Sequence, residues 1–111
     1  MIAIPVLIDI PSLPSEGTFD SQVDGATTFF ISGSVSSSKD NTIVGIQFYV
    51  DDVLWGTGQI YCTKANYHQT FIPLLLGGDI TIGPHTAKAV AMNEETLFNG
   101  VNDYLYIAQM I

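Results

Sequence analysis

The sequence predicts an all-β protein that folds as one antiparallel β-sandwich of about seven to eight strands. In several segments apolar residues recur at every second position, which is the period of a strand with one buried face. Turn-forming residues separate these segments at short intervals. No comparable pattern indicates a helix, and only residues 94–97 could form one helical turn. A chain of 111 residues is long enough for one sandwich core and too short for two, so residues 1–111 should form one domain.

The composition is poor in charge. Charged residues make up 13% of the chain, about half of the roughly 25% found in an average globular domain. Hydrophobic residues make up 47%, so we expect part of the apolar surface to be buried against a partner. Three basic and eleven acidic residues leave a net charge of −8. The sequence therefore lacks the dense basic patches that bind nucleic acid or anionic membranes.

The N-terminus and the cysteine content suggest where the protein is made. Met1 is not followed by the basic segment of a signal peptide, and Pro5 and Asp9 interrupt the first apolar run. No apolar run reaches the roughly 20 residues that a membrane-spanning helix needs. Cys62 is the only cysteine, so no internal disulfide can form. We expect a complete protein made in the cytosol.

The first strand should cover residues 2–10, where isoleucine and valine alternate with other residues. Pro5 lacks an amide hydrogen, so this strand should lie at a sheet edge or outside the sheet ladder. Proline and small polar residues predict a loop over residues 11–25. The second strand should cover residues 27–35, with its odd-numbered side chains on one face, before a polar loop at residues 36–41.

A hairpin over residues 43–58 is the strongest local signal. The side chains of one face alternate along its first strand: Val44, Ile46, Phe48 and Val50. Asp51 and Asp52 are turn-tolerant residues between two apolar runs, and the extended pattern resumes at residues 53–55. The rest of the fold should be organised around this hairpin.

The second half of the chain predicts three more strands, over residues 67–76, 85–92 and 102–111. The first of these should bend or lie at an edge, because it contains Pro73. Residues 77–79 and 83–84 predict tight turns, and residues 93–100 a turn or loop. Residues 59–67 are ambiguous.

Two stretches resemble the bacterial immunoglobulin-like (Big-type) domains found in surface proteins, glycoside hydrolases and bacteriophage virion proteins. They are Val-Gly-Ile-Gln-Phe-Tyr-Val-Asp-Asp at residues 44–52, followed by Gly56 and Gly58, and Gly-Pro-His-Thr-Ala-Lys-Ala-Val-Ala-Met-Asn at residues 83–93. The resemblance implies an immunoglobulin-like sandwich and no particular activity. Asp52 stands where the family has glycine, and Asn93 stands where it has aspartate, which weakens a calcium site there.

Soft metal ligands are few: Cys62, His68 and His85. Their spacing matches no recognised zinc site. We therefore interpret His85 as a structural histidine that bonds across a turn. Asp51 and Asp52 could join Asp40 or Asp79 around calcium, but turn formation already explains both residues. We predict no metal site and no cofactor.

Catalytic constellations are also missing from the sequence. Glu94 and Glu95 are adjacent on a predicted loop, whereas glycosidase carboxylates must face each other across a cleft. The serines at residues 36–38 have no nucleophile elbow, and Gly77-Gly78 is not followed by the lysine of a phosphate loop. We predict that the protein is not an enzyme.

Six aromatic side chains allow two interpretations: Tyr49, Trp55, Tyr61, Tyr67, Tyr104 and Tyr106. Exposed aromatic faces can stack on sugar rings, but tyrosine and tryptophan also anchor protein contacts and fill sandwich cores. In the last strand the two tyrosines share one face, and Leu105 and Ile107 the other. We interpret the aromatic residues as core or interface.

These observations favour a virion structural protein, namely a capsid decoration or cement protein (or a tail-associated one) of a bacteriophage. Its partners would be viral coat protein or other virion subunits, in many copies, with self-association also possible. The predicted interface is Ile2, Ile4, Val6, Ile8, Tyr104 and Tyr106, and Asp at positions 4 and 6 should release the protein from its particle with its fold intact. The alternative is an extracellular or cell-surface module, either adhesive or carbohydrate-binding, of a bacterial surface protein or glycoside hydrolase.

Overall fold

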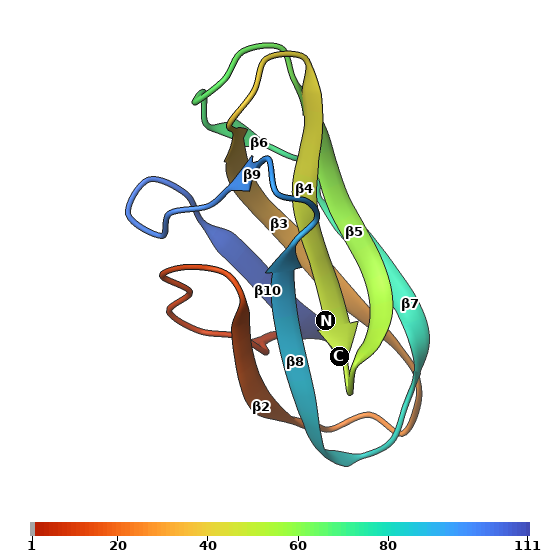
Figure 1. Cartoon of the computed structure of the whole chain (residues 1–111). Helices are drawn as coiled ribbons and strands as arrows, with labels where there is room; N and C mark the ends of the chain where they lie inside the picture. Colours follow the sequence, from red (N-terminus) through yellow and green to blue (C-terminus); the bar gives the residue numbers. More distant parts are fainter. Residues whose placement is uncertain (1) are drawn as a thin grey trace.

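The computed structural model describes residues 2–111, which form two antiparallel sheets packed face to face (Figure 1). The strands are β1 (Ala3–Pro5), β2 (Ser15–Ser21), β3 (Gly25–Ser37), β4 (Thr42–Val50), β5 (Val53–Cys62), β6 (Gln69–Thr70), β7 (Leu74–Ile80), β8 (Gly83–Ala91), β9 (Thr96–Leu97) and β10 (Leu105–Met110). Over this part of the chain, no helix has the length and apolar character needed to cross a bilayer.

The larger sheet is built on β3. One edge of β3 pairs with β10, which in turn pairs with β1, while β6, β7 and β9 also pair with β3. The smaller sheet has the order β2-β8-β4-β5. The two chain ends lie side by side, because the amide of Ile111 donates to the carbonyl of Ile2 at 2.8 Å (Figure 1).

The predicted all-β sandwich is confirmed, with ten strands in place of seven to eight. The pairs β3–β7 and β4–β8 correspond to the neighbouring strands B–E and C–F of immunoglobulin domains. The terminal strands are placed differently. In the immunoglobulin order the first strand, A, lies beside B and the last strand, G, lies beside F. Here the last strand, β10, pairs with β3, and the early strand β2 pairs with β8, so the two terminal strands have exchanged sheets.

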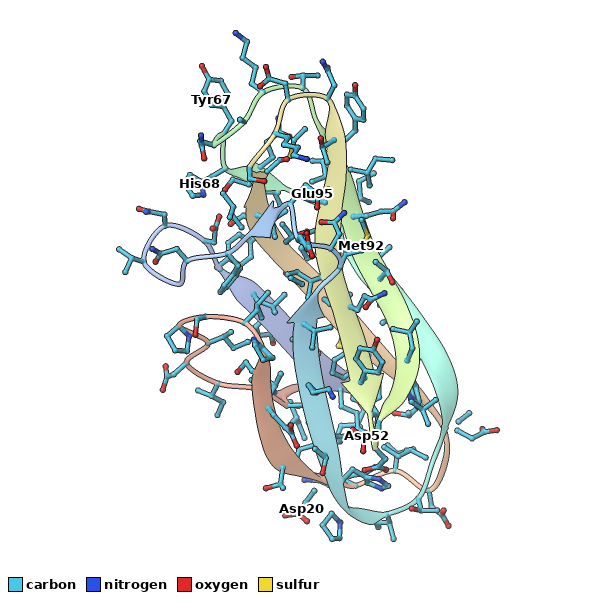
Figure 2. The ribbon with its side chains drawn as sticks, in the orientation of Figure 1. Asp20, Asp52, Tyr67, His68, Met92 and Glu95 are labelled. Atoms are coloured by element: carbon cyan, nitrogen blue, oxygen red, sulfur yellow. The ribbon has the colours of Figure 1, made fainter. Side chains whose placement is uncertain are left out.

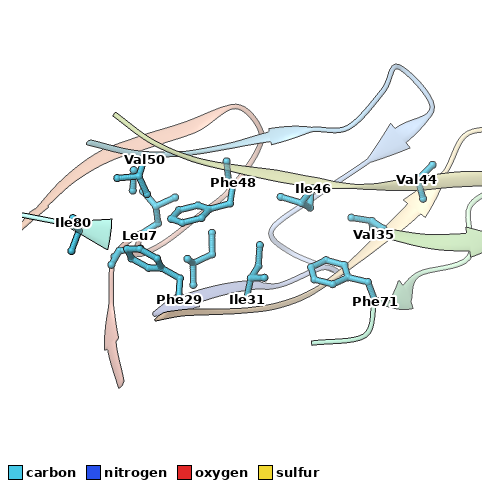
Figure 3. Close-up of a cluster of buried hydrophobic side chains, with 14 of the residues drawn as sticks. Leu7, Phe29, Ile31, Val35, Val44, Ile46, Phe48, Val50, Phe71 and Ile80 are labelled. Atoms are coloured by element: carbon cyan, nitrogen blue, oxygen red, sulfur yellow. The ribbon is translucent and has the colours of Figure 1, made fainter. Parts of the chain in front are cut away.

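The core lies between the sheets and follows the predicted alternation. Phe29 and Ile31 of β3 face Ile46 and Phe48 of β4, and all four side chains are fully buried (Figure 3). The other buried residues of this layer include Val35, Val44, Val50, Ala87, Ala89 and Ile107. The faces predicted for β3 and β4 are therefore confirmed. In β10 the grouping is as predicted, but Ile107 is buried whereas Tyr104 and Tyr106 on the other face are exposed.

The β4–β5 hairpin forms where the sequence predicts it. Asp51 and Asp52 have φ angles of 49° and 65°, the left-handed values that both central residues of a type I′ turn require. Aspartate tolerates this conformation better than most residues, so the absence of the family glycine at position 52 does not prevent the turn.

The N-terminal segment differs from the prediction. Of the strand predicted at residues 2–10, only Ala3–Pro5 (β1) pairs with β10, and Pro5 lies at the sheet edge as expected. The chain then turns inward, so Val6 and Leu7 join the core, at 5% and 8% exposure. Val6 therefore cannot belong to an exposed docking strand. Asp at position 6 should unfold the domain, because it would bury an unpaired charge.

The predicted loop at residues 11–25 contains β2, an error of the sequence interpretation. Its sequence, Ser-Glu-Gly-Thr-Phe-Asp-Ser, holds one large apolar residue, Phe19, so no alternation is visible. Pairing with β8 over seven positions specifies the strand. β2 is an edge strand whose inner side chains are half-buried, apart from the buried Ser21, and this explains its polar composition.

The strand predicted at residues 67–76 is two strands, β6 and β7, separated at the buried Phe71 and the exposed Pro73. The glycines at 77 and 78 lie inside β7, not in a turn. The ambiguous residues 59–62 continue β5, and β9 lies within the loop predicted at residues 93–100.

Candidate functional site

A pocket of about 380 Å³ lies where the β4–β5 turn meets the β7–β8 turn. Four apolar and four polar residues line it: Val50, Val53, Trp55 and Ile80, and Asp51, Asp79, Thr81 and His85. Its size falls within the range of about 300–1,000 Å³ that is common for small-ligand sites. Asp52 marks this end of the molecule in Figure 2, at the tip of the hairpin.

A β-bulge directs Trp55 toward this pocket. Phe48 pairs with Gly56 and Tyr49 pairs with Leu54, so Trp55 is the extra residue in β5. A bulge of this kind bends the strand and re-aims the side chain. The indole ring packs edge-on against Phe29, with centroids 5.0 Å apart and an interplanar angle of 90°.

Glycine in β7 makes room for this indole ring. A Cβ atom at Gly78 would lie 2.7 Å from the ring of Trp55, which is closer than real contacts allow. Trp55 is half-buried in this position, packed against the core and lining the pocket. The bulge in β5 and the glycine in β7 together allow the Trp55 ring to lie between the two sheets.

His85 is held on both ring nitrogens. Nδ1 contacts Oδ2 of Asp51, and Nε2 lies 2.7 Å from the carbonyl oxygen of Thr81. Both of these oxygens are acceptors, so a ring that makes both bonds donates from both nitrogens and is protonated. The hydroxyl of Thr81 also lies 3.3 Å from Nε2. This confirms the prediction of a structural histidine that bonds across a turn.

In this pair each residue favours the charged form of the other. The hydrogen bond to Asp51 raises the pKa of His85, and this outweighs the opposite effect of burial. The amide of Thr86 donates to Oδ1 of Asp51 at 2.9 Å, and together with the bond from His85 it lowers the pKa of the Asp51 carboxyl. Each oxygen of Asp51 therefore accepts one hydrogen bond from the protein.

A second polar cluster lies at the opposite end of the sandwich, where His68 is labelled in Figure 2. The carboxylate of Asp103 is buried and accepts from Ser34 Oγ at 3.0 Å, from His68 Nδ1 at 2.8 Å and from the amide of Asn99 at 3.1 Å. In a nucleophilic triad the serine is hydrogen-bonded to the histidine, and the histidine to the aspartate. Here the serine donates directly to the carboxylate, so the cluster is not arranged as a triad. The cluster joins three chain segments.

The predicted interface residues are not brought together into one surface. Ile2 and Ile8 are exposed, Ile4 is half-buried, and Val6 is in the core. Tyr104 and Tyr106 are exposed at 48% and 37%. The ring of Tyr106 packs against Phe30 on the outer face of the larger sheet, with centroids 6.1 Å apart.

The tyrosines of the smaller sheet lie on its outer face. The hydroxyl of Tyr49 donates to Gln47 at 3.2 Å, and the ammonium of Lys88 lies 5.4 Å from the Tyr49 ring centroid. Tyr61 is exposed and donates to Asn41 at 3.1 Å. These contacts are local to the sheet surface, and neither tyrosine lines the pocket beside Trp55.

Metal binding finds no support within residues 2–111, where no group of three or more His, Cys, Asp or Glu residues is arranged to hold an ion. Cys62 is buried, and burial raises the pKa of its thiol, so it is a poor ligand and nucleophile. The sequence suggested that Asp51 and Asp79 could lie together, but it gave no sign that Trp55 and His85 line the same pocket.

No protein-family model and no curated protein matches this sequence. Among solved structures, the chain is similar to the EclA C-terminal domain, described as a sugar-binding protein, with 12% identity over 91% of this chain and 77% of that chain, and a TM-score of 0.47. It is also similar to part of a β-glucosidase from Paenibacillus barengoltzii, with 10% identity over 86% of this chain and a TM-score of 0.48. The matched region spans 10% of the glucosidase.

Proposed function

We propose that this protein is a non-catalytic binding module and that the pocket beside Trp55 binds a sugar residue of a carbohydrate. The observation that supports this most directly is the half-buried indole of Trp55 beside the exposed polar side chains of Asp79 and Thr81. A sugar ring has apolar C–H faces that pack on an aromatic ring, and hydroxyl groups around its rim that bond to polar side chains.

The pocket is suited to binding without turnover. Both ring nitrogens of His85 and both oxygens of Asp51 have partners inside the protein. A general base needs a free lone pair to remove a proton, so an imidazole held on both nitrogens is not available for this role. A module of this kind would work outside the cell or at its surface, where polysaccharides are exposed.

The test is binding of the intact protein to a glycan array, followed by titration of the best ligands. Trp55→Phe should weaken binding because the stacking surface shrinks, and Val53→Asp should weaken it without disturbing the core, since Val53 is 62% exposed. Tyr61→Ala is the matched control, an exposed aromatic residue away from the pocket. Thermal unfolding of each variant checks the fold. If no glycan binds, or if Tyr61→Ala alone removes binding, the proposal is wrong.

A second candidate function is the capsid decoration protein that the sequence favours, bound in many copies to viral coat subunits. One observation supports it. The outer face of the larger sheet carries Phe30, Tyr106 and Leu75 in adjacent positions, and Leu75 is 69% exposed. This patch contains no charged side chain and would suit contact with another protein.

This second candidate makes a separate prediction. The protein should co-sediment with bacteriophage heads encoded in the same genome, and Leu75→Asp with Tyr106→Asp should abolish co-sedimentation while the fold survives. Trp55→Phe should leave co-sedimentation unchanged. Glycan binding without co-sedimentation would reject the decoration role.

A further inference from the structure

We infer that the pocket beside Trp55 selects ligands rich in hydrogen-bond donors, namely neutral or amino sugars, and rejects sugars that carry carboxylate, sulfate or phosphate groups. This inference rests on the proposed function and adds the chemical class of the ligand. It is based on the hydrogen-bond donors, cations and acceptors around the pocket.

The N–H donors of His85 and Thr86 beside the pocket are already used. The two N–H groups of His85 point to Asp51 and to the carbonyl of Thr81. The amide of Thr86 donates to the other oxygen of Asp51. A ligand anion would find no free charged donor among these groups, and it would have to break an existing bond to obtain one.

The lysine ammonium groups of the protein lie elsewhere. The sequence contains three basic residues, Lys39, Lys64 and Lys88, and none of them lines the pocket. Lys88 lies on the outer face of the smaller sheet, over the ring of Tyr49 and 3.7 Å from a carboxylate oxygen of Asp52. Anionic sugars are usually bound through such cations, most effectively by forked or paired donors.

Of the side chains that remain available, Asp79 is a charged acceptor and Thr81 offers a hydroxyl that can accept or donate. Asp79 is exposed at the pocket, and within the described part of the chain no ion pair involves its carboxylate. The Asp51 carboxylate, 51% exposed, adds negative charge that His85 balances. An ammonium or hydroxyl group of a ligand can donate to Asp79, whereas a ligand carboxylate would be repelled by it.

Trp55 provides a direct measurement, because it is the only tryptophan in the protein. Its fluorescence is followed while the intact protein is titrated with matched sets of monosaccharides: glucose, glucosamine and glucuronate, and then galactose, galactosamine and galacturonate. We expect the amino sugar to bind at least as tightly as the neutral sugar, and the acidic sugar to bind about fivefold to tenfold more weakly at low salt.

Two variants separate the local charge from the overall charge. Asp79→Asn should remove the preference for the amino sugar and reduce the difference in affinity between the neutral and the acidic sugar. Glu94→Gln makes the same change in net charge on an exposed loop beyond the far end of β8, and it should leave the order of affinities unchanged.

The outcomes distinguish the inference from the function on which it rests. If an acidic sugar binds as tightly as its neutral counterpart, or if Glu94→Gln changes the order as much as Asp79→Asn does, the inference is wrong although sugar binding stands. If no sugar of any class perturbs Trp55, the proposed function is wrong and the inference falls with it.

Discussion

Each end of the sandwich holds one pair of a histidine and an aspartate, and the two pairs are built in opposite ways. At the hairpin end the His85 side chain is 11% exposed and Asp51 is 51% exposed. At the other end His68 is 43% exposed and Asp103 only 1%. In both pairs Nδ1 of the histidine contacts a carboxylate oxygen.

The buried member of each pair determines what the pair does. A buried carboxylate must accept several hydrogen bonds, and Asp103 accepts three from three parts of the chain. A buried imidazolium must donate from both nitrogens, and His85 thereby fixes the wall of the pocket. We therefore expect Asp103 to act on stability and His85 on the pocket.

The largest expected effect comes from neutralising each aspartate with an amide of the same shape. Asp103→Asn should lower the free energy of unfolding by about 2–4 kcal/mol, because an amide nitrogen would face buried donors. Asp51→Asn should cost less, about 1 kcal/mol, because water replaces lost bonds at an exposed site. Urea unfolding measures both. An equal or larger loss for Asp51→Asn would contradict the comparison.

The next prediction concerns the histidines and ligand binding. His85→Gln should weaken sugar binding about fivefold, which corresponds to about 1 kcal/mol, because the loop at Thr81 loses its tie to the hairpin. His68→Gln should leave binding unchanged, since it lies at the other end of the molecule. Titration monitored by Trp55 fluorescence tests this. Similar losses for the two variants would show that the ends are coupled.

A smaller effect on stability is expected from changes in pH. The raised pKa of His85 means that its contribution to stability is present below its ordinary pKa, about 6.5, and is lost as the pH rises through the folded value. The lowered pKa of Asp51 means that its contribution is present above about pH 4 and is lost as the pH falls through the folded value. The pair should therefore stabilise most between about pH 4 and 6.5.

This pH dependence can be measured by NMR titration of the His85 ring. Its midpoint should lie above the ordinary histidine value and should fall in Asp51→Asn. The change in unfolding free energy should be small, because half of the Asp51 side chain is in water. A midpoint that does not move in the variant would show that Asp51 is not the cause.

The smallest effect should come from Asp52, the neighbour of Asp51 in the same turn. Asp52 is 85% exposed, and its oxygen lies 3.7 Å from the ammonium of Lys88. Asp52→Gly should change stability by no more than about 0.5 kcal/mol, because glycine suits a positive φ and surface ion pairs contribute little. Thermal unfolding of this variant beside Asp51→Asn would show whether position 51 alone ties the turn to β8.

Much of the fold could be predicted because its strongest signals are local. The alternation in β3, β4 and β10 reveals the buried faces, and Asp51-Asp52 reveals the turn. β2 could not be predicted this way, since a polar edge strand shows no alternation and exists through its pairing with β8. The direction of Val6 depends on where β1 leaves β10, which no local pattern encodes.

The sequence by itself determined the fold class, the hairpin and the inward faces of the central strands, because each depends on neighbours within a strand or a turn. Only the tertiary structure decided the pocket. Trp55 lines the same pocket as Asp79 and His85 because of a bulge in β5 and the packing of β7 beside it. Both depend on strand register between segments far apart in the chain.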